Sequence, residues 1–300
     1  RKGHLPPDFM EKKPDRSYFE APSELVAPMI EKITSAALRN GIPARDIQVL
    51  APMYRGSAGI DQINNLMQEL LNPLETDALF FQALDCQYRN GDKVIHLVND
   101  AESNVFNGDI GYITDLLPAK YTESKQDELT IQFDGNELVY PRNEWYKIRL
   151  AYAMSIHKSQ GSEFPVVILP LTNQSRRMLQ RNLIYTAITR SKSKLILLGE
   201  YTAFHFATQN TGTARKTYLI ERFSDVLPQR TDSSSQIPVH LEELDKKTEP
   251  QSELVSVENH SDSSDSQHSQ QGYRLTKDNY LSIDPMIGLT EEEIQHFFKN

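Results

Sequence analysis

Two blocks in the second half of this 300-residue chain constrain its fold more than any other feature. Residues 150–164 (LAYAMSIHKSQGSEF) run from an apolar, strand-like stretch into a polar turn that contains glycine. Residues 182–191 (NLIYTAITRS) have the apolar spacing of a helix, and Arg190 stands at its end. Strand, loop and helix in succession are typical of an α/β domain, whose functional residues lie on the loop after the strand.

The two blocks resemble motifs V and VI of superfamily 1 helicases, and residues 157–164 (HKSQGSEF) are closest to the RecD-like branch. Residues 49–56 (VLAPMYRG) resemble motif IV of the same enzymes and precede the other two in the same order. The chain is therefore identified as similar to the C-terminal half of a RecD-like DNA helicase, the family of the exodeoxyribonuclease V alpha subunit. The resemblance implies an ATP-dependent motor that moves 5′ to 3′ on single-stranded DNA in repair and recombination.

The phosphate-binding loop of such a motor is missing from the sequence. That loop places a lysine directly after a glycine, and none of the 13 glycines here is followed by lysine. No acidic pair that would hold magnesium precedes motif IV either. We therefore expect ATP and Mg²⁺ to be bound mainly by an absent N-terminal motor domain, and this chain alone to bind neither tightly and to hydrolyse ATP negligibly.

Resemblance also assigns residues to the nucleotide. Arg190 matches the motif VI arginine that reaches the γ-phosphate, and such an arginine accelerates phosphoryl transfer by about 10³ to 10⁵. Arg55 matches a second phosphate-contacting arginine in motif IV. Four further residues are implied to lie at the nucleotide or to shape its turn: Tyr54, Gln160, Gly161 and Glu163. Packing alone is an equal explanation for Tyr54.

The single-strand channel is expected to use the first half of motif V. Ser155, His157 and Lys158 match residues that line the channel, where hydroxyl groups anchor phosphate oxygens and lysine adds a salt-sensitive attraction. Weaker candidates, for which surface or core positions explain the residues as well, are Trp145, Tyr146, Arg176, Arg177 and Arg181. No metal site is expected.

Hydrophobic periodicity predicts a RecA-like α/β domain with an all-β insert. Strands are expected near residues 18, 48, 151, 167 and 196, and helices over residues 23–39, 59–71, 177–189 and 201–208. Between them, residues 129, 131 and 133 alternate with polar neighbours, and Asn-Gly and Asp-Gly pairs indicate hairpins. Such an insert matches the SH3-like domain of the RecD-like family.

The expected organisation has five parts. They are a connection at residues 1–16, a motor domain at 17–88 and 148–227, an SH3-like insert at 89–147, a disordered acidic linker at 228–272 and an apolar motif at 273–300. The charge of −9 lies entirely beyond residue 230, where 14 acidic and 5 basic residues stand. Such a composition cannot bury enough apolar surface to order the linker. The apolar motif after it is expected either to dock on the helicase or a repair protein, or to have no role.

Several remaining features favour a cytoplasmic monomer that uses single-stranded DNA as its partner. Cys86 is the single cysteine, so an intrachain disulfide is excluded, and a half-buried position in a reducing compartment is expected. No apolar run is long enough to cross a membrane. Two alternatives stay open, namely a non-catalytic DNA-binding module and the helicase part of a conjugative relaxase.

Overall fold

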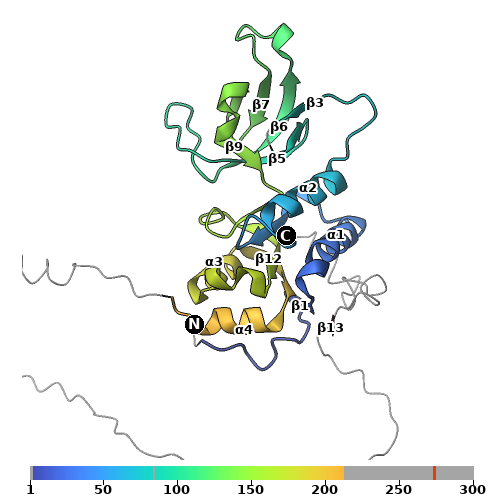
Figure 1. Ribbon diagram of the computed structural model, residues 1–300, viewed down its shortest axis with the longest axis vertical. Helices are drawn as coiled ribbons and strands as arrows, with labels where there is room; N and C mark the ends of the chain where they lie inside the picture. Colours follow the sequence, from blue (N-terminus) through green and yellow to red (C-terminus); the bar gives the residue numbers. More distant parts are fainter. Residues whose placement is uncertain (1–2, 84, 213–272, 275–300) are drawn as a thin grey trace, which may run out of the picture. The chain divides into compact units, whose positions relative to one another are not determined.

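A computed structural model describes residues 3–83, 85–212 and 273–274 of the chain (Figure 1). Within these residues, a six-stranded sheet has the order β10, β2, β11, β12, β1, β13, and all neighbouring strands are parallel. The strands are β1 (Arg16–Glu20), β2 (Ile47–Ala51), β10 (Ala153–Ser155), β11 (Phe164–Leu171), β12 (Ser191–Gly199) and β13 (Tyr273–Arg274). The predicted parallel sheet of the motor domain is thereby confirmed.

Helices cover both faces of this sheet because its strands are apolar on both sides. Val49 and Ile168 pack in one core with α1 (Ser23–Arg39) and α2 (Ile60–Leu71), which lie side by side (Figure 1). Leu50 and Val167, which stand next to Val49 and Ile168 in their strands, pack in a second core. This core contains residues of α3 (Arg181–Ile188) and α4 (Tyr201–Gln209). Buried parallel strands of this kind need a helical layer on each face.

The insert is a five-stranded antiparallel sheet of order β8, β7, β6, β5, β9. Its strands are β5 (Lys93–His96), β6 (Ile110–Leu117), β7 (Glu128–Gln132), β8 (Glu137–Pro141) and β9 (Ile148–Leu150). A hairpin of β3 (Phe80–Gln82) and β4 (Gln87–Arg89), which the sequence did not predict, precedes it. The alternating residues Leu129, Ile131 and Phe133 are all buried, as their spacing predicts.

The structure differs from the sequence-based prediction at two elements. Leu150, expected in the motor sheet, belongs to β9 and pairs with Val94 of the insert, while the motor strand begins at Ala153. The helix expected from residue 177 begins instead at Arg181, because the buried Leu179 interrupts it in an extended conformation after a short 3₁₀ segment.

The core of the insert is continuous with the core under α1 and α2. Trp145 stacks on Phe81 and donates from its ring nitrogen to the Tyr140 carbonyl, and all three belong to the same buried cluster as Val49. Among the helices that the structure describes, none has the length and apolar content to span a bilayer. The predicted acidic linker and nearly all of the apolar motif lie outside the described residues.

Candidate functional site

The motif IV loop follows β2 and closes on the start of α2. The N–H of Gly59 donates to the Gly56 carbonyl, and the N–H of Asp61 donates to the Tyr54 carbonyl at 3.1 Å. Gly56 takes a φ of +102°, which favours glycine. The tight turn leaves the side chains of Tyr54 and Arg55 exposed at the carboxyl edge of the sheet.

Motif V leaves β10 at the same edge and then returns in a series of turns. The N–H of Lys158 donates to the Ser155 carbonyl, and the Ser159 hydroxyl donates to the Ile156 carbonyl. Ser155 is nearly buried, His157 is exposed, and Lys158 is half-buried. Burial, with a smaller contribution from Arg149, lowers the pKa of Lys158.

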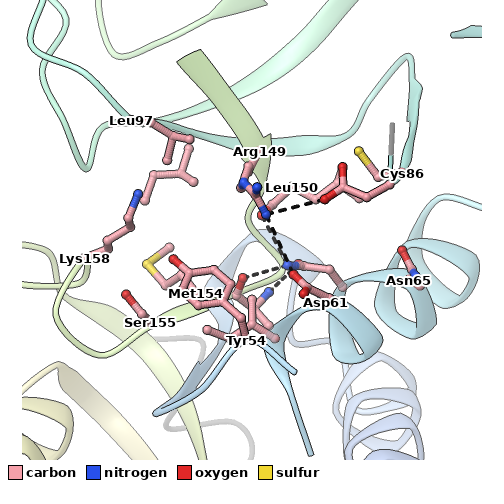
Figure 2. A pocket seen from close by; sticks show the side chains of 15 residues that line it. Tyr54, Asp61, Asn65, Cys86, Leu97, Arg149, Leu150, Met154, Ser155 and Lys158 are labelled. Atoms are coloured by element: carbon pink, nitrogen blue, oxygen red, sulfur yellow. Dashed lines mark hydrogen bonds and ion pairs between the residues drawn. The ribbon is translucent and has the colours of Figure 1, made fainter. Parts of the chain in front are cut away.

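A pocket along the open edge of β10 brings the two loops together (Figure 2). Tyr54, Ser155 and Lys158 line it with Arg149, which projects from β9 of the insert. The Arg149 guanidinium lies 3.6 Å from a carboxylate oxygen of Asp85 and 3.9 Å from one of Asp61. An adjoining pocket adds Arg55 to Tyr54, Lys158 and Arg149.

The opposite, amino edge of the sheet holds the second half of motif V. The Arg190 guanidinium donates to the Ser162 carbonyl at 2.9 Å, and the Arg190 carbonyl accepts from the N–H of Phe164, the first residue of β11. Glu163 is exposed and pairs with Lys192 at 3.5 Å. Gln160 and Gly161 are also exposed.

The strand directions separate the predicted site residues into two groups. Arg55 follows the carboxyl end of β2, whereas Arg190 precedes the amino end of β12, and the sheet is parallel. A strand advances about 3.3 Å per residue, so a strand of five residues separates the edges by roughly 16 Å. The structure therefore places Arg55 and Tyr54 with Lys158 rather than beside Arg190.

The weaker candidates lie in different environments. Trp145 is buried in the insert core, while Tyr146 is exposed. Arg176 lies over the ring of Phe206, and Arg181 donates to the Thr208 carbonyl. Both arginines thus hold α4 in place. The apolar spacing of residues 182–191 would place Ile188 on the buried side of the helix, but Ile188 is exposed because α3 ends there.

Three residues of the pocket were missed by sequence reasoning. Arg149 stands between the buried Ile148 and Leu150, and this alternation was the available signal that it points outward. Asp61 and Asp85 had no signal in the sequence. In the part of the chain that the structure describes, no cluster of three metal-ligating side chains occurs, so no metal site is proposed.

Two family models match the chain. Residues 150–198 match the UvrD-like helicase C-terminal domain, and residues 63–133 match the SH3 domain of ATP-dependent RecD-like DNA helicases. The chain thus carries one region that is similar to the C-terminal domain of UvrD-like helicases and one that is similar to the SH3 domain of RecD-like helicases. More closely, it is homologous to the RecD-like DNA helicases, as the following relatives show.

The ATP-dependent RecD2 DNA helicase of Deinococcus radiodurans is 35% identical over 176 residues, which cover 59% of this chain and 23% of the relative. The RecBCD enzyme subunit RecD of Mycolicibacterium smegmatis is 26% identical, over 59% of this chain and 30% of the relative. A Bacteroides Pif1 structure bound to single-stranded DNA covers 66% of this chain and 53% of its own, with 16% identity and a TM-score of 0.38. This chain spans about a quarter of the length of the RecD2 relative.

Proposed function

We propose that the chain is the C-terminal portion of an ATP-dependent 5′ to 3′ DNA helicase that acts in repair and recombination in the cytoplasm. One observation carries the proposal. Motif V runs from the pocket of Lys158 at one edge of the motor sheet to Glu163 and Arg190 at the other edge. A segment with this course can connect a site that holds a DNA strand with a site that holds a nucleotide.

At the carboxyl edge, the proposed ligand is single-stranded DNA. Lys158, Arg55 and Arg149 bring positive charge to adjoining pockets, and the Ser155 hydroxyl is suited to a phosphate oxygen. The exposed ring of Tyr54 offers a face for a base, since aromatic side chains stack on bases in single-strand grooves. We therefore assign Arg55 and Tyr54 to the strand in place of the nucleotide.

At the amino edge, the proposed ligand is ATP with Mg²⁺, held mainly by a motor domain outside this sequence. The nucleotide supplies the phosphoryl group that is transferred to water. Arg190 would stabilise the charge on its terminal phosphate, and Glu163 with the turn at Gln160 and Gly161 would border it. The bond from Arg190 to the Ser162 carbonyl already orients the guanidinium at this edge.

Fluorescence anisotropy with a labelled oligonucleotide tests the strand site. We expect weak binding. The logarithm of the association constant should fall linearly with the logarithm of the salt concentration, with a slope of about −0.7 for each phosphate neutralised. The double variant His157→Ala, Lys158→Ala and the single variant Arg55→Ala should each weaken binding and flatten the slope. Arg39→Ala, which removes an exposed arginine at the end of α1, is the matched control. Equal behaviour of all variants would contradict the strand assignment.

Steady-state ATP hydrolysis tests the nucleotide site. The chain has no phosphate-binding loop, so we expect turnover at the background rate. A turnover above background that survives Arg190→Ala would contradict both the predicted inactivity and the role of Arg190.

A further inference from the structure

A fully buried carboxylate joins the insert to the motor domain. Asp92, directly before β5, has no exposed surface and accepts four hydrogen bonds. One oxygen accepts from the Asn72 amide at 2.8 Å and the Tyr152 hydroxyl at 2.9 Å. The other accepts from the Gln68 amide at 2.6 Å and the Arg89 N–H at 2.7 Å. All the acceptor capacity of an ionised carboxylate is therefore in use.

The four donors come from segments with separate roles. Gln68 and Asn72 are at the end of α2, whose beginning closes the motif IV loop, and Arg89 ends β4. Tyr152 stands immediately before β10, the strand that leads into motif V. Asp92 thus connects the insert with the end of α2 and with the strand that leads into motif V. Burial raises its pKa, while the hydrogen bonds oppose that change.

The next residue reaches the other end of motif V. Lys93 is buried, donates to the Arg45 carbonyl at 3.4 Å and lies 5.6 Å from the centre of the Phe164 ring. Phe164 is the last residue of motif V and the first of β11. Asp92 and Lys93, adjacent in the chain, therefore contact the two ends of the segment from Tyr152 to Phe164.

The insert also approaches the middle of that segment. A Cβ added to Gly108, which precedes β6, would lie 3.4 Å from the Lys158 carbonyl. Figure 2 shows Lys158 facing Leu97 of the insert across the pocket, with Arg149 nearby. Any shift of the insert would therefore change the spacing between two positive charges, Arg149 on the insert and Lys158 on motif V.

We propose that Asp92 is a positioning residue that couples the SH3-like insert to motif V, and that the Tyr152 hydroxyl is the contact that transmits this coupling. The carboxylate keeps the insert and motif V in register, so that Arg149 and Lys158 face one DNA strand. The effect of this coupling on DNA binding rests on the proposed function. The mechanical coupling rests on the hydrogen bonds and packing contacts described above and does not depend on that function.

Tyr152→Phe removes this one contact and leaves the other three donors on Asp92. A matched control is Tyr140→Phe, because the Tyr140 hydroxyl is buried in the insert and has no hydrogen-bond partner in the described structure. We expect Tyr152→Phe to increase amide hydrogen exchange about tenfold in residues 155–163, with β7 and β8 unchanged. Tyr140→Phe should change neither region. Unchanged exchange in motif V, or an equal increase throughout the chain, would overturn the proposal.

Oligonucleotide affinity separates the proposed coupling from a role in stability alone, because a purely structural role of the Tyr152 hydroxyl would leave this affinity unchanged. Well below the unfolding temperature, Tyr152→Phe should weaken binding severalfold, and this effect should disappear in the Lys158→Ala background. A severalfold loss that persists without Lys158 would contradict the coupling to motif V. If the unaltered chain binds no oligonucleotide, the proposed strand site fails, whereas the exchange experiment still decides whether Asp92 couples the insert to motif V.

Discussion

Replacing Gly59 with alanine should break the motif IV loop for a purely steric reason. Gly59 has a φ of −85°, which any residue adopts, so backbone freedom does not explain the glycine. The lack of space explains it, because a Cβ at this position would lie 2.4 Å from the Tyr54 carbonyl oxygen and 2.8 Å from the Arg55 carbonyl oxygen. Both are backbone atoms, which cannot rotate away as a flexible side chain can.

The expected cost follows from the displacement that relieves this contact. The Tyr54 carbonyl must move by roughly 1 Å to reach an ordinary van der Waals separation. It accepts from the Asp61 N–H at 3.1 Å, and such a shift removes that bond. Overpacking costs about 1 to 3 kcal/mol and a lost hydrogen bond about 1 kcal/mol, so we expect a decrease of about 2 to 4 kcal/mol in unfolding free energy.

Urea unfolding followed by far-ultraviolet circular dichroism and by Trp145 fluorescence measures this cost. Gly135→Ala is the control, since Gly135 has a φ of +83° but no atom within 4 Å of an added Cβ, and should lose only about 1 kcal/mol. Oligonucleotide affinity should fall as well in Gly59→Ala, because Tyr54 and Arg55 move. A stability loss no larger than that of Gly135→Ala would refute the steric argument.

Two further predictions concern buried titratable groups. Burial lowers the pKa of His96 below its unfolded value of about 6.5, so protons favour the unfolded chain as the pH falls. The unfolding free energy should therefore decrease between pH 7.5 and 5.5, and the decrease should be smaller in His96→Phe. Equal decreases in the two proteins would contradict the role of His96. Burial raises the pKa of Cys86 to about 11. Its alkylation by iodoacetamide at pH 8 should be about a hundredfold slower than that of an unperturbed thiol, and a rate near the unperturbed one would show that the thiol is exposed.

Elements with strong local patterns were predicted well from the sequence. The strand at residues 47–51 and the helix at 23–39 appear at their expected positions, because apolar periodicity directly records which side chains are buried. The hairpin of β7 and β8 forms around the Asp-Gly pair at residues 134 and 135 for a similarly local reason. Such elements depend on neighbours within one or two turns of the chain.

Pairing between distant segments was not predictable in the same way. By composition, the short apolar run around Leu150 fits the insert sheet and the motor sheet equally well. Its antiparallel pairing with Val94 assigns it to the insert sheet. The four donors on Asp92 likewise come from residues up to 60 positions away. Polar residues with no periodic spacing give no sign that they meet in a buried cluster.

The sequence by itself determined the class of the chain, because the residues of motifs IV, V and VI and the alternating apolar strands are local properties that resemblance and periodicity can read. The tertiary structure alone decided which edge each motif occupies. Arg55 and Arg190 both follow apolar segments in the sequence, yet one comes after a strand and the other before a strand of the same parallel sheet. Strand direction converts that difference in chain order into opposite sides of the domain.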